Sequence, residues 1–201
     1  MMKTLTPAGT TTSFIETYDC LKPEECGITI KTAWQFMQDH ANTEHVARDN
    51  NDTRNDTQAF LTSARFQRPF EDRMMRWIKP HWNEYSKKYH IHKQIEDVFD
   101  PLYKIQLSET GGGYLNPHYE QQRGRSGMAE RFAVWMIYLN DGFKGGQTYF
   151  THQELEIAPK QGMLAIWPAS YTHRHHAVNN LVGKKWAATG WFRYKVDGLT
   201  A

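Results

Sequence analysis

Six short segments in the C-terminal half of the chain constrain its fold most strongly. Each segment is apolar or alternates between apolar and polar residues, each is bounded by Gly, Pro or Asn-Asp, and no stretch with helical periodicity separates them. Strands that follow one another without crossover helices pair antiparallel, so we expect a β-sandwich or barrel, of which the jelly roll is a common form. The segments are LYKIQLS, YLNPHYE, RFAVWMIYLN, TYFTHQELEIAP, GMLAIWPAS and KKWAATGWFRY.

Helical signals gather in the N-terminal half. After SFIETYD, which has the composition of a strand, the proline and acids of Pro23-Glu24-Glu25 are typical of the first turn of a helix, and we expect that helix to run to about Met37. FEDRMMRWIKPHWNEYSKKYH is predicted to be a helix that breaks near Pro80, because proline lacks the N–H that a helix needs. DNNDTRNDTQ is rich in turn-forming residues and is predicted to be a loop.

These assignments predict a mostly β (α+β) fold in a single domain that covers residues 1–201. Within it, a strand and helices at residues 1–99 pack on a double-stranded β-helix (jelly-roll) core at residues 100–195. A chain of 201 residues, 39% of them hydrophobic, can bury such a core without disulfide bonds.

The composition argues against several classes of protein. A net charge of +2 without a block of basic residues gives no case for binding nucleic acid. Cys20 and Cys26, without a zinc-ligand pattern, fit a reducing compartment. The first residues, MMKTLTPAGTTTSF, lack the apolar run of a signal peptide, and no stretch reaches the ~18 apolar residues of a membrane span. We therefore expect a soluble, cytoplasmic protein with neither nucleic-acid nor membrane partners.

Two groups of polar residues in the β half suggest a metal site. His118 and Glu120 stand two positions apart in a predicted strand, and residues i and i+2 share one face of a strand, although a polar exposed face gives the same pattern. A second group, His173, His175 and His176, lies in WPASYTHRHHAV. Two imidazoles and one carboxylate with open positions are typical of non-haem iron sites, and zinc accepts the same donors.

Four further motifs connect these groups to a family. They are Tyr138-Leu139-Asn140-Asp141, Gly145-Gly146-Gln147-Thr148-Tyr149-Phe150, Pro159-Lys160-Gln161-Gly162, and a histidine followed ten residues later by a lysine, His175 and Lys185. In this order they resemble the Fe(II)- and 2-oxoglutarate-dependent dioxygenases, in particular the prolyl 4-hydroxylase-like branch. The resemblance covers about residues 100–193, and motif matches of this kind are hypotheses for a structure to test.

The resemblance implies a metal site made of His118, Glu120 and His175. Glu120 stands where most of the family has aspartate, and its extra methylene asks only for a small shift of the backbone. We prefer His175 to His173 as the third ligand because Lys185 follows it at the usual interval of ten residues. His173 is then an outer partner that orients the ligand, or a surface residue.

The resemblance also implies the co-substrates. Lys185 is expected to bind the far carboxylate of 2-oxoglutarate, Tyr138 to donate its hydroxyl to the same carboxylate, and Thr148 to line the pocket. A tyrosine that the family carries about nine residues before the first histidine is replaced by Glu109, and Gln106 and Tyr114 are candidates to take over its role. Fe(II), 2-oxoglutarate and O₂ are therefore expected, with ascorbate as a candidate accessory reductant.

The implied reaction is hydroxylation of a C–H bond with release of succinate and CO₂. The substrate is expected to be a prolyl residue of a peptide, or alternatively a free amino acid or other small molecule. Residues 48–60 and 121–130 are candidate substrate-contacting segments, and Arg123 or Arg125 could pair with a substrate carboxylate. Two other classes stay open: a zinc hydrolase on a cupin-like barrel, and a non-catalytic metal-binding jelly-roll protein.

Overall fold

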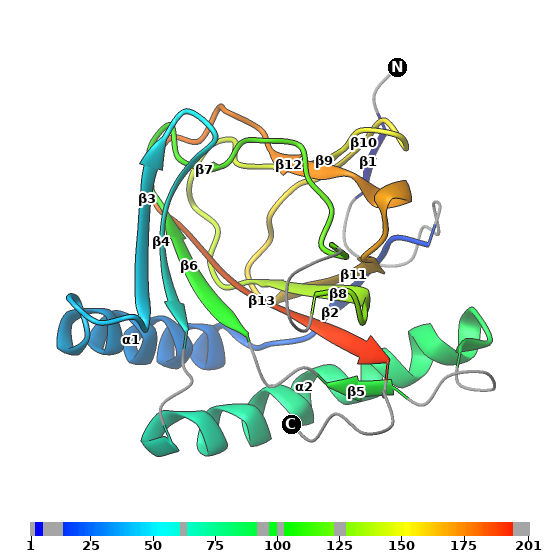
Figure 1. The fold of residues 1–201 in the computed structure, drawn as a ribbon, viewed down its shortest axis with the longest axis horizontal. Coiled ribbons are helices and arrows are strands. Elements are labelled where there is room, and N and C mark those ends of the chain that lie inside the picture. Colours follow the sequence, from blue (N-terminus) through cyan, green and yellow to red (C-terminus); the bar gives the residue numbers. More distant parts are fainter. Residues whose placement is uncertain are drawn as a thin grey trace.

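The computed structural model of the protein describes residues 3–5, 14–60, 64–91, 97–99, 103–122 and 128–194. Its strands form two sheets, and helices α1 (Pro23–Asp39) and α2 (Ala64–Lys88) lie against the larger one (Figure 1). The main path of the nine-stranded sheet is β2 (Glu16–Asp19), β11 (Met163–Pro168), β8 (Arg131–Tyr138), β13 (Lys185–Tyr194), β6 (Lys104–Ser108), β4 (Arg54–Phe60) and β3 (Val46–Asn51). Two short strands extend it, β5 (Asp97–Phe99) on β13 and β7 (Gly113–Tyr114) on β4. The four-stranded sheet contains β1 (Lys3–Leu5), β10 (Leu155–Ile157), β9 (Thr148–Phe150) and β12 (His175–Ala177).

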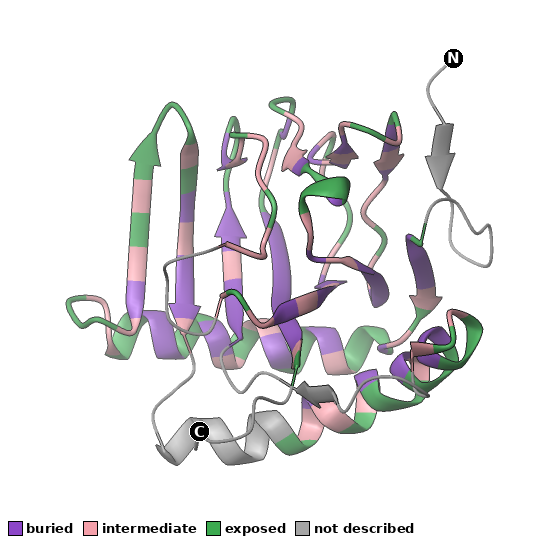
Figure 2. Ribbon diagram, turned by 45° about the vertical axis from the view of Figure 1, so that its right-hand side comes forward, coloured by how far each residue is buried: buried purple, intermediate pink, exposed green. Residues whose placement is uncertain are grey.

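The larger sheet separates two hydrophobic cores. Successive side chains of a strand point to opposite faces, and in β8 Trp135 and Ile137 belong to the core that includes α1 and α2. Val134 and Tyr138 of the same strand belong to a second core, which includes Phe150 of the smaller sheet. Figure 2 shows the buried central strands between the helices and the loops of the opposite side.

The mostly β class with helices packed on the sheet is confirmed. Strands from both halves of the chain join the larger sheet: β2, β3 and β4 come from the first 99 residues, and β6, β8, β11 and β13 come from the rest. Every pairing along the main path of this sheet is antiparallel. The predicted helix from Pro23 is also confirmed as α1, whose first turn carries the expected acids, and the backbone N–H of Lys22 donates to Glu25 at 2.8 Å.

Residues 46–60 form a β-hairpin, so the prediction of a loop for DNNDTRNDTQ was wrong. β3 pairs with β4 from Val46↔Ala59 to Asn51↔Arg54. The side chain of Asn51 accepts hydrogen bonds from the N–H groups of Thr53 and Arg54, which closes the turn. β4 also pairs with β6, which follows it by more than forty residues in the chain. Pairing with a distant strand overrides the turn-like composition.

Helix α2 continues through Pro80, so the predicted break was also wrong. The proline removes one backbone hydrogen bond, but an apolar stripe on both sides of it is buried against the sheet, and this burial holds the helix together. The buried residues of the stripe are Met74, Ile78, Trp82 and Tyr85. None of the helices among the described residues, α2 included, has an apolar stretch long enough to cross a membrane.

Strand β13 approaches β8 closely at Gly190. A Cβ atom at this position would lie 2.3 Å from a ring carbon of Trp135, whose side chain is fully buried. Close approach of a backbone to a large side chain is one of the uses of glycine. The contact matters for the site described below, because Thr189 and Trp191 flank Gly190 and point to the other face of the sheet.

Candidate metal centre

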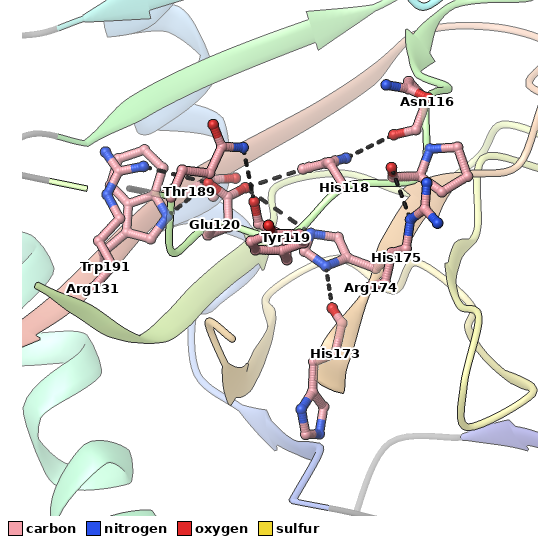
Figure 3. A network of polar contacts seen from close by, with 12 residues as sticks. Asn116, His118, Tyr119, Glu120, Arg131, His173, Arg174, His175, Thr189 and Trp191 are labelled. Carbon is pink, nitrogen blue, oxygen red and sulfur yellow. Dashed lines mark hydrogen bonds and ion pairs between the residues drawn. The ribbon is translucent and has the colours of Figure 1, made fainter. Parts of the chain in front are cut away.

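Three predicted ligand residues meet in the structure. His118 and Glu120 follow β7, His175 begins β12, and two backbone hydrogen bonds of 2.9 and 2.8 Å join His118 to His175. Nε2 of His118 lies 3.4 Å from Oε1 of Glu120, and Nε2 of His175 lies 4.0 Å from the same oxygen. One donor atom from each residue lies within 4.8 Å of the others (Figure 3).

The convergence of His118 and Glu120 has a different cause from the one predicted. The strand expected over YLNPHYE ends at Tyr114, and His118 forms only a single bridge to His175. The backbone N–H of Glu120 donates to the carbonyl of Ala169 at 3.1 Å. Two anchors in neighbouring segments, rather than the alternation of a strand, bring the imidazole and the carboxylate together.

Backbone carbonyls fix the protonation of both imidazoles. Nδ1 of His118 lies 2.8 Å from the carbonyl oxygen of Asn116, and Nδ1 of His175 lies 2.8 Å from that of His173. A carbonyl oxygen only accepts, so each Nδ1 carries a proton and each Nε2 is directed toward Glu120. Burial, with His118 acting in the same direction, lowers the pKa of His175 to about 3, so this ring is neutral at physiological pH.

The two oxygens of Glu120 face different groups. Oε1 faces the histidines, while Oε2 accepts a hydrogen bond from Nε1 of Trp191 at 3.1 Å and lies 3.4 Å from the Arg131 guanidinium. Burial alone would raise the pKa of Glu120, but the contact with His118 and the charges of Lys104 and the histidines outweigh it and hold the pKa well below its usual range. The carboxylate is therefore ionised, and two imidazoles with one carboxylate are a donor set that fits a divalent cation.

His173 takes the part of an outer partner through its backbone. Its carbonyl orients His175, while its imidazole lies away from the three donors and Nδ1 is 3.0 Å from Oγ1 of Thr172 (Figure 3). His173 ends a short 3-10 helix, Tyr171–His173, whereas His175 begins β12, so the two residues do not share a strand face. Of the two histidines, the structure brings only the His175 ring to His118 and Glu120.

The residues expected to bind a co-substrate lie beside the same centre. Lys185 is buried, its Nζ donates to the carbonyl of Gly146 at 2.5 Å, and it lies 5.3 Å from the centre of the Tyr138 ring. The Tyr138 hydroxyl and Oγ1 of Thr148 are 2.8 Å apart. Lys185 and Thr148 line one cavity together with His118, Glu120 and His175, whereas Tyr138 does not line it but contacts Thr148 and Lys185.

Lys185 has a positive charge without a negative partner. Among the described residues, no carboxylate lies within 4.0 Å of its ammonium. Burial lowers its pKa to about 8, so the side chain is still charged at neutral pH. A buried ammonium of this kind is stabilised by an anion that enters the cavity.

Comparison with known proteins finds a family to which the part of the chain that carries this geometry is similar. Residues 105–193 match the family model described as the 2OG-Fe(II) oxygenase superfamily. The chain is 30% identical over 134 residues to the prolyl 4-hydroxylase subunit alpha-1 of Bos taurus and to that of Homo sapiens, a match that covers 57% of this chain and 25% of each relative. The matched region is thus about a quarter of the length of these relatives.

Solved structures with the same fold include two prolyl hydroxylases. The viral collagen prolyl hydroxylase from Paramecium Bursaria Chlorella virus-1, in its 2OG complex, has a TM-score of 0.68 at 20% identity, over 91% of this chain and 97% of that one. A Pseudomonas putida prolyl-4-hydroxylase also has a TM-score of 0.68, at 17% identity, over 92% and 95% of the two chains. The double-stranded β-helix predicted for this chain is thereby confirmed.

Glu109, at the position where the spacing placed the missing family tyrosine, does not line the cavity. It is 64% exposed and pairs with Lys184 at 2.9 Å. Both proposed replacements, Gln106 and Tyr114, line that cavity. Tyr114 stacks on the imidazole of His118, with ring centres 3.7 Å apart, and so supports the ring from one side.

A second cavity of about 380 Å³ adjoins the first and shares the His118 and Glu120 wall. Residues of the β3–β4 hairpin line it, and contact of residues 48–60 with the substrate stays a prediction. From the segment 121–130, Gln122 and Met128 line it, while Arg123 and Arg125 lie outside the described residues.

Lys104 lines both cavities, and it was not among the residues predicted for the site. Burial and the nearby charge of Arg54 lower the pKa of Lys104 to about 8, although the charges of Glu120 and Asp56 act to raise it. The signal in the sequence was the alternation in β6, where Ile105 and Leu107 belong to the helix-side core and Lys104 points to the other face.

Proposed function

We propose that the protein is an Fe(II)- and 2-oxoglutarate-dependent dioxygenase that hydroxylates a C–H bond, with a prolyl residue or a free amino acid as its substrate class. His118, Glu120 and His175 would hold the iron. The observation that carries the proposal is that two imidazole nitrogens and one ionised carboxylate converge within 4.8 Å, beside a cavity with a buried ammonium that has no carboxylate partner among the described residues.

Lys185 would hold the far carboxylate of 2-oxoglutarate, and the Tyr138–Thr148 pair would add a hydroxyl donor near it. In support, the buried Lys185 ammonium faces the cavity and is paired only with a carbonyl. A carboxylate there would supply the counter-charge that burial makes necessary. A zinc hydrolase or a non-catalytic jelly-roll protein would have no use for this cationic position.

The chain itself would orient the reactants and exclude water. When bound, the ferrous ion with 2-oxoglutarate and O₂ supplies the oxidising chemistry, and succinate and CO₂ are the by-products. Trp191 and Arg131 hold one oxygen of Glu120, which leaves the other directed to the histidines. The rings of Trp167 and Phe150 pack around His175 at 5.1 and 5.5 Å between centres and keep that side dry.

The proposal is tested by two measurements on the purified protein. Anaerobic addition of Fe(II) and 2-oxoglutarate is expected to give a weak visible charge-transfer band that zinc does not give. With oxygen, succinate is expected to form, and His118→Ala should abolish both signals. His152→Ala, which changes an exposed histidine, is the matched control and should behave as the wild type. Succinate formation that survives in His118→Ala would show that the ligand set is wrong.

The prolyl residue is the first substrate to test, because the relatives named above are prolyl 4-hydroxylases. One further solved structure with this fold is a Trichoplax adhaerens prolyl hydroxylase in complex with a peptide fragment, with a TM-score of 0.60 at 13% identity. Hydroxylation of a prolyl peptide in the presence of Fe(II), 2-oxoglutarate and ascorbate, followed by mass spectrometry, tests this choice directly.

We also propose that residues 1–201 fold as one domain and that the protein works in the cytoplasm. In support of one domain, β2–β4 and both helices pack on the sheet that carries the site. In support of a reducing compartment, Cys20 and Cys26 are both thiols. A single cooperative unfolding transition and the location of a fluorescent fusion would test the two statements.

A further inference from the structure

Lys104 lies at one end of a strand pair whose other end carries Lys185. In the antiparallel pairing of β6 with β13, Lys104 is opposite Thr189 and Ser108 is opposite Lys185. Both lysines point to the face that lines the first cavity. Four residues separate the two positions along the pair, so their Cα atoms are about 13 Å apart. The cavity therefore has two cationic positions rather than one.

The ammonium of Lys104 is buried and lacks a counter-ion. The residue is 8% exposed, and no carboxylate of the described residues lies within 4.0 Å of it. Its ammonium lies 5.7 Å from the centre of the Trp191 ring. Burying a charge in this way costs free energy unless an anion accompanies it.

The nearest acids already have partners. Asp56 accepts two hydrogen bonds from Arg54, at 2.9 and 3.1 Å, and one from Gln106 at 3.0 Å. Glu120 faces the histidines with one oxygen and Trp191 with the other. Neither carboxylate is in direct contact with Lys104, so among the described residues its ammonium is left open to an anion of a bound molecule.

The second cavity indicates which molecule brings that charge. In the proposed function the far carboxylate of 2-oxoglutarate binds Lys185. This lysine lines the first cavity but not the second. Lys104 lines the second cavity as well, and there His118 and Glu120 form part of the same wall. A second molecule in this space would place its anionic group on Lys104 and another part of itself next to the metal ligands.

We propose that Lys104 binds a carboxylate of the substrate, and that the substrate is a small carboxylic acid of the amino-acid class rather than an internal residue of a peptide. An internal prolyl residue has amide bonds on both sides and offers no anion there, whereas a free amino acid carries a carboxylate within a few bonds of every carbon that can be hydroxylated. This inference rests on the proposed function and narrows its substrate.

The test compares free and blocked amino acids as substrates. Each of the twenty L-amino acids is supplied as the free acid, and all except aspartate and glutamate also as the N-acetyl N′-methylamide, which has no carboxylate. The readout is succinate formed above the level without substrate. We expect one or more free acids, and no blocked compound, to stimulate the reaction. Equal stimulation by a blocked compound, or none by any free acid, would overturn the inference.

Variants of Lys104 make the test specific to the residue. Lys104→Met should raise KM for the stimulating acid by about 30-fold or more, because a buried charge contact is lost, and Lys104→Arg should retain part of the binding. KM for 2-oxoglutarate should be unchanged, and the exposed Lys144→Met is the control. Equilibrium dialysis of the labelled acid against the anaerobic Fe(II)–2-oxoglutarate protein measures binding without turnover.

The proposed function and the role of Lys104 can be refuted separately. A wild-type protein that gives neither the charge-transfer band nor succinate would refute the proposed function itself. A protein that gives both, but whose Lys104→Met variant keeps the wild-type KM and dialysis constant, would refute only the role of Lys104. Retention of the band in Lys104→Met shows that the variant is folded.

Discussion

Replacing Lys185 with methionine should make the ligand-free protein more stable and, at the same time, weaken its binding of 2-oxoglutarate. Methionine has nearly the length of lysine but no charge. Lys185 is 8% exposed, and its ammonium has one carbonyl partner, that of Gly146, at 2.5 Å. The substitution therefore removes a buried charge without opening a large cavity.

The gain in stability follows from the pKa of Lys185. Burial lowers this pKa from 10.5 to about 8, and the difference corresponds to about 3 kcal/mol of cost for the charged form in the folded state. The variant also loses the hydrogen bond to Gly146, which offsets about 1–2 kcal/mol of the stability gained by removing the charge. The free energy of unfolding of Lys185→Met at pH 7 should thus exceed that of the wild type by about 1–2 kcal/mol.

The pH dependence has a definite sign. Between pH 8 and 10.5 the unfolded chain keeps the Lys185 proton while the folded chain has lost it, so the stability of the wild type rises with pH in this window. The advantage of Lys185→Met should therefore be complete at pH 7 and shrink as the pH rises through 8. Denaturant unfolding of ligand-free protein at several pH values measures it.

The loss of binding is expected to be larger than the gain in stability. Removing one partner of a buried charge pair costs about 2–5 kcal/mol, or roughly 30-fold to several thousand-fold in Kd. Anaerobic titration with 2-oxoglutarate, followed by the charge-transfer band, measures it. Lys184→Met is the control, since Lys184 is 62% exposed and should change stability by less than about 0.5 kcal/mol. A Lys185→Met protein that is less stable and binds 2-oxoglutarate normally would refute the reasoning.

Two further pairs of variants test other parts of the structure. His175→Ala should abolish iron binding in equilibrium dialysis, whereas His173→Ala should retain it, because only the backbone carbonyl of His173 reaches His175; equal loss in both would contradict this. Gly190→Ala should lower the free energy of unfolding by about 1–3 kcal/mol or more, since its Cβ would meet Trp135 at 2.3 Å. Gly27→Ala, in α1 with no atom within 4 Å of the added Cβ, should instead raise it by about 0.5–1 kcal/mol, and a similar change for both glycines would count against the packing argument.

Local sequence patterns predicted the parts of the fold whose causes are local. The apolar runs gave β8, β11 and β13, and the proline and acids at residue 23 gave the start of α1. The β3–β4 hairpin was missed because its stability depends on pairing with β6, and because the buried polar side chains of β4, Asp56 and Gln58, read as loop residues. The predicted break at Pro80 failed because burial of the stripe on α2 outweighs one lost hydrogen bond.

The sequence predicted the side chains of the candidate site but not the main-chain groups that orient them. His118, Glu120 and His175 were chosen from residue type, spacing and family resemblance, and the structure brings their donor atoms together. The groups that orient the two rings were not predictable in this way, because they are main-chain carbonyls. Lys104 was missed because one lysine in a half-apolar strand resembles an ordinary solvent-facing residue until its surroundings are known.

Orientation of the imidazoles by main-chain carbonyls has a consequence for how such a site tolerates mutation. A side-chain partner can be lost in a single substitution, whereas every amino acid at position 116 or 173 supplies the same acceptor oxygen, provided that the backbone path is kept. Substitutions at these two positions then leave the orientation of the imidazoles unchanged. The geometry of the centre therefore depends on the path of the backbone rather than on which amino acids stand at these positions.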